Sequence, residues 1–399
     1  MKKVFVLVMV VAMVMVAAIG CAGSKTETPS ASADPVADAP TAETESAGEE
    51  AAPPAEESAE PAADGSAEGK KIGILMPSVV VARWADDASA MEEAAAALGM
   101  ETELQFADDS IDTQVMQIEN MITKGYDALV ICPVNAESLG DALSKAKAAG
   151  LVIVSYDRLI RETTDVDYYV TFDNIKVGEV CGEYIEEHLD LKNGAGPFNL
   201  EIFTGDIADN NAKMTLQGGM NILQQYIDSE QLIVQSGQTT LEQTATESWA
   251  TGNAQDRMDN IMSGYYTDKH LDAILSTYGG MSLGCIASLQ ALGYGTDDNP
   301  MPIITSQDGE LAIVQAVAEG TLSMSLFKDT RELAQQAINL LASTFKGEEV
   351  SLDESKFYDN GAFDIPTVLL DPIPFDKDNL DKVMIDDSGY WTHEDIYGE

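Results

Sequence analysis

The sequence predicts an α/β protein made of two doubly wound parallel-sheet lobes joined by a hinge. Three observations lead to this prediction. From Lys70 onward, strand-like and helix-like segments alternate along the chain. The strands are continuous apolar runs, as in parallel sheets that helices cover on both faces, and the series occurs twice. With 399 residues, 45% of them hydrophobic, the chain is long enough for two cores of ordinary size.

The first series begins with residues 71–76 (KIGILM), an apolar strand. The helix that follows, 84–98, places Met91, Ala95 and Leu98 on one face. The rest of this series comprises a strand at 101–106, a helix that contains Val115, Ile118 and Ile122, a strand at 128–134, a helix at about 136–149 and a strand at 151–157.

A second series begins after the strand-like segment 168–174 (YYVTFDN). It comprises helices at 176–189, about 212–226, 250–264 and 282–292, and strands at 198–205, 231–237, 271–278 and 301–308. The remaining residues, 310–399, contain a helix, the apolar segment TLSMSLF, a longer helix at 330–345 and a tail rich in Pro and Asp.

The first 69 residues do not fit this pattern. Residues 1–20 contain two lysines, an apolar run from Val4 to Ile19 and small residues before Cys21. The apolar run is shorter than the roughly 20 residues that cross a bilayer, and its flanks predict an export signal peptide. AIGC resembles the lipobox of bacterial lipoproteins, in which the cysteine is lipidated; an ordinary cleaved signal or a short anchor is the alternative. Residues 21–69 lack aromatic and nearly all aliphatic side chains, which predicts a disordered acidic linker after the lipidated cysteine.

The formal net charge of the chain is −46. Nucleic acid and anionic membrane surfaces repel so acidic a protein, and we expect neither as a partner. Besides Cys21, the cysteines are Cys132, Cys181 and Cys285, which show no CxxC or metal-ligand spacing. We therefore expect these cysteines to be buried small residues, and we expect no metal site. The sequence does not decide whether two of them form a disulfide.

Motifs for catalysis or cofactor binding are scarce. The histidines are His188, His270 and His393, and none is near a Ser or Cys nucleophile motif. No GxGxxG follows the first strand and no GxxxxGK[ST] occurs, so no nucleotide cofactor is expected. Residues 376–387 begin like a calcium loop but carry Asp381 where the turn needs Gly. The sequence therefore predicts a binding protein without a cofactor rather than an enzyme.

Polar and aromatic residues follow the carboxyl ends of the predicted strands, where open parallel sheets bind their ligands. The candidate binding residues are Arg83, Trp84, Asp157, Arg158, Asp209, Asn211, Trp249, Tyr278, Asp308 and Lys328. Aromatic rings suit the apolar faces of a sugar, and the two-pronged groups of Asp, Asn and Arg suit its neighbouring hydroxyls. This combination favours a sugar site.

Each candidate also has a purely structural interpretation. Trp84 or Trp249 could pack in a core, and Asp209 could cap the helix that follows it. Asp157 and Arg158 could form a structural ion pair. Because all the candidates lie at strand ends, the joint interpretation as a binding site is the stronger one.

Eight segments of the chain have distinctive sequences: SVVVARWADD, FADDSIDTQVMQIENMITKGYDALVI, SYDRLIRET, YYVTFDN, GPFNLEIFTGDIADNNA, RMDNIMSGYYTD, SQDGE and FKDTREL. These segments, in this order, resemble those of the type I periplasmic binding proteins for xylose, ribose and galactose, which supply ABC transporters. The resemblance is strongest to the multiple-sugar-binding group of plant-associated bacteria. It extends over nearly all of residues 70–399.

The resemblance implies the same site residues. Arg83 and Trp84 match the sugar-contacting pair on the first loop, Asp157 and Arg158 the YDR motif, Asp209 and Asn211 the DNN segment, Asp308 the QDA-like segment, Lys328 the lysine after the late strand, and Trp249 the second stacking aromatic. There are two departures. Gly279 follows Tyr278 where the family often has Asp, and SWATGNAQ replaces the usual Arg-Trp-Asp-Pro around Trp249.

The fold of this family implies three crossings between the lobes and closure of the hinge around a ligand. The N-terminal lobe would comprise residues 70–172 and 328–350, and the C-terminal lobe residues 173–327 and 351–399. The resulting hypothesis is a monomeric, lipid-anchored receptor on the extracytoplasmic face of the cell membrane. It would capture a monosaccharide, a pentose or a hexose, and deliver it to an ABC permease.

Two other classes of function were compared with this hypothesis. A sugar-sensing receptor subunit that presents its closed form to a membrane sensor kinase is the alternative, and both roles can coexist. A repressor of the lactose-repressor group would need an N-terminal helix-turn-helix, where this chain has a signal and a linker.

Overall fold

The structure, a computed structural model, describes residues 66–350 and 352–398. The predicted signal peptide, Cys21 and nearly all of the predicted linker lie outside the described residues. Ala67 is 5% exposed and belongs to the core, and the Gly69 N–H donates to the Gly99 carbonyl at 2.8 Å. The expected end of the linker at residue 69 is therefore wrong, because the last residues of that segment pack against the fold.

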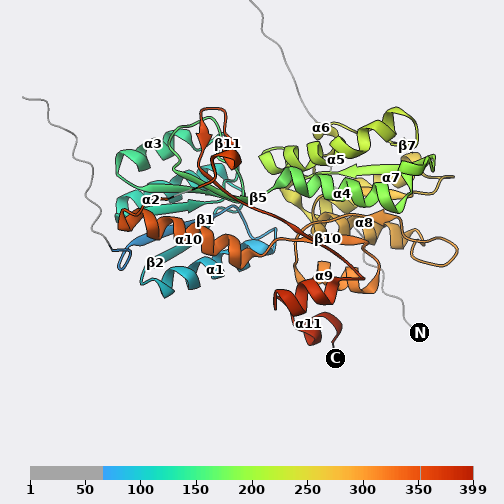
Figure 1. Ribbon diagram of the computed structural model, residues 1–399. Helices are drawn as coiled ribbons and strands as arrows, with labels where there is room; N and C mark the ends of the chain where they lie inside the picture. Colours follow the sequence, from blue (N-terminus) through green and yellow to red (C-terminus); the bar gives the residue numbers. More distant parts are fainter. Residues whose placement is uncertain (1–65, 351, 399) are drawn as a thin grey trace, which may run out of the picture. The chain divides into compact units, whose positions relative to one another are not determined.

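In the described part of the chain, six parallel strands form the sheet of the N-terminal lobe, in the order β13-β5-β4-β3-β1-β2. Their bounds are β1 (Lys71–Met76), β2 (Glu101–Phe106), β3 (Ala128–Ile131), β4 (Val152–Tyr156), β5 (Tyr168–Phe172) and β13 (Thr367–Leu370). Helices α1 (Arg83–Ala97) and α10 (Thr330–Lys346) cover one face, and α2 (Ile111–Lys124) and α3 (Gly140–Ala148) cover the other (Figure 1).

Both faces of this sheet are buried, which explains why its central strands are apolar without alternation. Along β1, Ile72 and Ile74 pack in the core beneath α1 and α10. Leu75 packs in the opposite core, beneath α2 and α3. Successive side chains of a strand point to opposite faces, so a strand covered on both sides has to be apolar at every position.

The sheet of the C-terminal lobe has the parallel order β7-β6-β8-β9. The strands are β6 (Phe198–Phe203), β7 (Leu232–Ile233), β8 (Ala273–Ser276) and β9 (Ile303–Ile304). The main helices are α4 (Asn174–His188), α5 (Asn210–Asp228), α7 (Thr251–Tyr265), α8 (Gly279–Ala291) and α9 (Leu311–Glu319). Two hydrogen bonds, from Ser323 N to Ile304 O and from Asp308 N to Leu326 O, join β10 (Met324–Phe327) to this edge. β14 (Ile373–Asp376) pairs with β10 in antiparallel orientation.

The described chain passes between the lobes after β5, after β10 and after β13. The Asp173 N–H donates to Leu370 O at 2.9 Å, which ties the first crossing to the last. The expectation that residues 351–399 belong to the C-terminal lobe is wrong for the described residues up to 370, because β13 pairs with β5. The short strands β11 (Tyr358–Asp359) and β12 (Asp364–Ile365) precede it, and Ile365 is buried in the N-terminal core.

The order of the predicted helices and strands agrees with the structure, and the differences lie at ends of elements and in the tail. The helix expected from residue 136 begins at Gly140 as α3, because the Asn135 side chain accepts hydrogen bonds from Glu137 N and Ser138 Oγ in a turn. The sequence did not predict the short helices α6 (Leu241–Thr244) and α11 (His393–Tyr397), the π-helix Asp381–Asp387, or the single 3₁₀ turns at Leu191–Asn193, Glu247–Trp249 and Glu354–Lys356.

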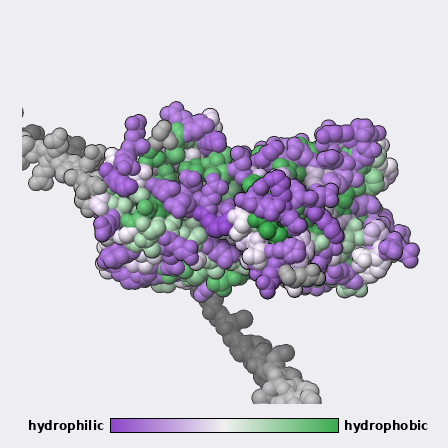
Figure 2. Space-filling view, turned by 60° about the horizontal axis from the view of Figure 1, so that its bottom comes forward, coloured by the Kyte–Doolittle hydropathy of each residue, from purple (hydrophilic) through white to green (hydrophobic). Residues whose placement is uncertain are grey.

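No helix within residues 66–350 and 352–398 is both long and apolar enough to cross a membrane. On the face that Figure 2 shows, hydrophilic residues predominate, with apolar areas between them.

Candidate ligand-binding site

A cavity lies between the two lobes, at the carboxyl ends of their strands. Its lining residues are Val81, Arg83, Trp84, Asp157, Arg158, Asp209, Asn211, Trp249, Tyr278, Gln307, Asp308 and Lys328. The structure thus brings all ten candidate residues together around one cavity. The sequence analysis missed two lining residues, Val81 and Gln307. Gln307 directly precedes Asp308, and this position at a strand end could have identified it as a site residue. Val81 is aliphatic, and nothing in the sequence distinguishes it from a core residue.

Arg83, the first residue of α1, connects three carboxylates. Its Nε is 2.9 Å from Asp87 Oδ2, its Nη2 is 3.1 Å from Asp157 Oδ2, and its Nη1 is 3.1 Å from Asp308 Oδ1. Lys328 Nζ lies 3.0 Å from the same Asp308 oxygen. Burial raises the pKa of Asp157, but the charges of Arg83, Lys328 and Arg158 outweigh it, so the pKa is lowered and the carboxylate stays ionised.

Asp157 and Asp308 occupy equivalent positions in the two lobes. Both have a left-handed backbone, with φ of 58° and 78°. Each N–H donates to a carbonyl of the neighbouring strand at 2.8 Å, to Val170 for Asp157 and to Leu326 for Asp308. A left-handed backbone is unfavourable for a residue with a Cβ and is retained where the surrounding structure enforces it, commonly at functional sites. The Arg83 guanidinium therefore bridges two corresponding carboxylates across the cleft.

Two further contacts cross the cleft beside Arg83. Arg158 Nε lies 2.9 Å from Asp209 Oδ2. Asn211 Nδ2 donates to the carbonyl and to the carboxylate of Asp157, both at 3.1 Å. Burial raises the pKa of Asp209 more than Arg158 lowers it. Asp209 also caps α5, since its Oδ1 accepts from Asn211 N at 2.9 Å. The structural roles considered for these residues thus coexist with their place in the cavity wall, and the contacts hold the lobes together over it.

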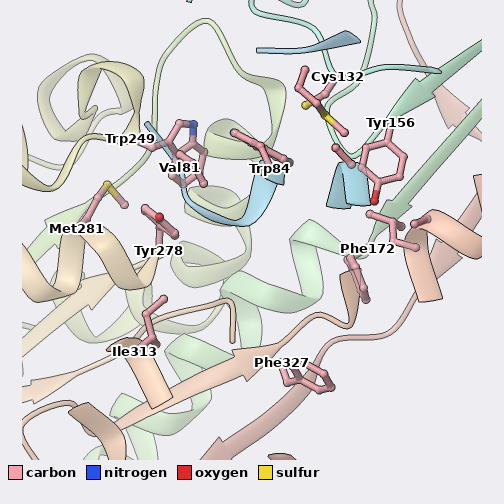
Figure 3. Close-up of a cluster of buried hydrophobic side chains, with 14 of the residues drawn as sticks. Val81, Trp84, Cys132, Tyr156, Phe172, Trp249, Tyr278, Met281, Ile313 and Phe327 are labelled. Atoms are coloured by element: carbon pink, nitrogen blue, oxygen red, sulfur yellow. The ribbon is translucent and has the colours of Figure 1, made fainter. Parts of the chain in front are cut away.

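Two tryptophans and a tyrosine provide the aromatic part of the wall. The Trp84 ring lies 5.0 Å from the Arg83 guanidinium and 5.3 Å from that of Arg158. Trp249 and Tyr278 meet edge to face, with ring centroids 6.0 Å apart, and Figure 3 shows them beside Val81. The indole N–H groups of Trp84 and Trp249 are buried without a hydrogen-bond partner among the described residues. Buried donors without partners are costly, and hydroxyls of a bound ligand would satisfy them.

The side chain of Ile313 fills the space beside Gly279. A Cβ at this position would lie 2.1 Å from Ile313 Cδ1, so the Asp that the resemblance suggested would require Ile313 to move. Tyr278 Oη instead donates to Glu310 at 3.1 Å. A carboxyl group from another segment of the chain therefore supports this tyrosine.

No histidine or cysteine of the described chain lines the cavity. Cys132, Cys181 and Cys285 are buried, as expected. They form no disulfide with one another, and burial raises the pKa of each thiol. Within the described residues, no group of His, Cys, Asp and Glu side chains is arranged to hold a metal ion. The arrangement can bind a polar ligand between paired charges and aromatic rings.

Two α/β lobes that close over a polar cavity define the type I periplasmic binding protein fold. The profile of the family described as periplasmic binding protein domain matches residues 72–349. The chain belongs to this family, which confirms the predicted fold class and the prediction of a binding protein rather than an enzyme.

Curated relatives agree with the resemblance seen in the sequence. Over 331 residues the chain is 43% identical to the multiple sugar-binding periplasmic receptor ChvE of Rhizobium radiobacter, covering 83% of this chain and 93% of that protein. Over 321 residues it is 32% identical to the D-xylose-binding periplasmic protein of Escherichia coli K12, covering 80% and 91%. The solved structure of an ABC transporter solute-binding protein from Clostridium phytofermentans with bound β-D-glucose has a TM-score of 0.78 and 43% identity, covering 82% of this chain and 100% of that one.

Proposed function

We propose that this protein binds a neutral monosaccharide, a pentose or a hexose, in the interlobe cavity and delivers it to an ABC permease. The observation that carries the proposal is the convergence of stacking rings and paired charged side chains from both lobes on one cavity. The relatives that are named for sugar binding and the glucose in the Clostridium protein support the same class of ligand.

The charges of the cavity favour a neutral ligand. Of the described side chains that line it, three are cations and three are carboxylates, and each cation lies within about 3 Å of at least one carboxylate oxygen. A uronate or an amino sugar would add a buried charge without a free partner, which is costly. A neutral polyol instead adds hydroxyls that donate to the carboxylates and accept from the cations.

Delivery to a permease follows from closure. Because residues of both lobes would contact the sugar, the sugar stabilises the closed form over the open one. A membrane partner can then distinguish loaded from empty protein by the relative position of the lobes. We further propose that the protein acts as a monomer, anchored at the extracytoplasmic face of the membrane through a lipid on Cys21.

A thermal-shift screen of the purified protein tests the ligand. Stabilisation increases with the ratio of ligand concentration to dissociation constant. At least one of D-glucose, D-galactose, D-xylose and L-arabinose should therefore clearly raise the melting temperature. D-glucuronate and D-glucosamine should not raise it. Trp84→Ala and Asp157→Ala should abolish the shift. Because both side chains are buried, each change should also lower the ligand-free melting temperature, and the melting curve shows whether the variant is folded. An unchanged melting temperature with every neutral aldose would contradict the proposal.

Sugar uptake in cells tests delivery. Deletion of the gene should abolish import of the labelled sugar that the screen identifies, and a gene copy with Cys21→Ala should release the protein from the membrane. Normal import combined with loss of sugar-induced transcription would instead favour the sensor subunit that presents its closed form to a kinase.

A further inference from the structure

Glu310 lies behind the aromatic wall of the cavity and does not line it. It is the residue directly before α9, and its Oε1 accepts a hydrogen bond from Tyr278 Oη at 3.1 Å. Its other carboxyl oxygen, Oε2, is buried and has no hydrogen-bond partner among the described residues. A buried carboxyl oxygen without a partner requires a physical explanation, since ionised carboxylates are strongly solvated in water.

The charged and titratable groups that face Glu310 come from three elements. Asp308 precedes it by two residues, the charge of Arg83 acts on it from α1 of the other lobe, and Tyr278 is the residue directly before α8. Burial and the charge of Asp308 raise the pKa of Glu310 to about 8, and Arg83 and Tyr278 oppose this only in part. The raised pKa favours the neutral carboxyl, which lowers the cost of burying this group beside Asp308.

Tyr278 connects Glu310 to the cavity. Its ring contacts Trp249 edge to face, with centroids 6.0 Å apart, and is only 6% exposed. A Cβ at Gly280 would lie 2.5 Å from Tyr278 Cε1, so the ring packs directly on the backbone at the start of α8. Burial raises the pKa of the Tyr278 phenol well above its ordinary value, and the phenol remains a hydrogen-bond donor to Glu310 at any pH that the protein tolerates.

We propose that Glu310 is a positioning residue for ligand binding: by accepting the hydrogen bond from Tyr278 Oη, it holds the Tyr278 ring against Trp249. This inference depends on the proposed sugar-binding function of the cavity.

Isothermal titration calorimetry at pH 6.5 tests this inference, with D-glucose or, if it gives no shift in the screen, the aldose with the largest shift. Glu310→Gln keeps an acceptor for Tyr278 and should bind within about threefold of the wild type. Glu310→Ala removes the acceptor and should bind at least tenfold more weakly than the wild type.

Two further variants separate positioning from a general structural effect. Tyr278→Phe should lose as much affinity as Glu310→Ala, and the double variant should lose no more than either, because both changes remove the same hydrogen bond. Glu319→Gln, on the exposed end of α9, is the matched control and should behave as the wild type. Ligand-free melting temperatures show whether each variant is folded.

The outcomes distinguish this inference from the proposed function. Wild-type affinity in Glu310→Ala, or equal losses in the Gln and Ala variants, would overturn the positioning role while leaving sugar binding intact. A wild type that binds no aldose would overturn the proposed function and this inference together.

Discussion

A single methyl group at Gly205 tests whether the Trp249 ring is part of the binding wall. A Cβ at this position would lie 2.0 Å from Trp249 Cε2 and Cζ2 and 2.2 Å from Cη2. Carbon atoms in contact are about 3.5 to 4.0 Å apart, so the ring has to move by roughly 1.5 Å or more. Gly205 is not in the left-handed region of φ, so alanine causes no backbone strain there. The effect of Gly205→Ala therefore comes from the ring alone.

The magnitude follows from the cost of overpacking. Forcing an extra methyl group into a packed site costs about 1 to 3 kcal/mol. If this cost falls on the closed, ligand-bound form, it corresponds to a loss of affinity of about 5- to 150-fold. Trp249 is 5% exposed and contacts Tyr278, so a displaced ring also disturbs the neighbouring part of the wall.

The assay is calorimetric titration with the sugar found in the screen, together with the ligand-free melting temperature. Gly264→Ala on α7 is the control, because a Cβ there meets nothing within 4 Å. It should leave affinity unchanged and stabilise the helix by about 0.5 to 1 kcal/mol. If Gly205→Ala binds the sugar as well as the wild type does, Trp249 is not part of the binding wall. If it fails to fold, Trp249 acts chiefly as a core residue.

The remaining predictions concern charges and close packing. Asp209→Asn leaves Arg158 without its carboxylate across the cleft and should weaken sugar binding by at least about 30-fold in calorimetry, since breaking such a pair costs 2 kcal/mol or more; near-normal affinity would show that the pair is dispensable. The pKa of Asp157 is lowered in the fold, so its stabilising contribution is present above its unfolded pKa of about 3.9 and is lost as the pH falls through the folded value. Asp157→Asn should therefore show a smaller fall in the free energy of unfolding than the wild type between pH 5 and pH 2, as measured by urea titrations, and parallel curves would refute this. Gly178→Ala would place a Cβ 2.0 Å from Thr215 O between α4 and α5, and denaturant unfolding should show a loss of about 3 kcal/mol or more; an unchanged midpoint would mean that the two helices separate freely.

The sequence determined the elements whose signals are local. The apolar run of β1 and the helical spacing of Met91 and Ala95 in α1 depend only on neighbouring residues, and the structure has both elements. The candidate site followed from the same information. In parallel sheets the carboxyl ends of the strands lie at one edge, so residues such as Asp157 and Asp308 were expected to meet although 151 positions separate them.

Only the tertiary structure decided the features that depend on contacts between distant segments. The four residues of β13 stand in a tail rich in Pro and Asp, and they form a strand because the edge of β5 supplies hydrogen bonds to them. Glu310 has no local sign of its role, since its hydrogen-bond donor Tyr278 is 32 positions away in the sequence. Gly205 is likewise indistinguishable from a turn glycine until the Trp249 ring is seen against it. The local pattern of a chain records its own periodicity, whereas burial, pairing and pKa are properties of the surroundings that the rest of the fold provides.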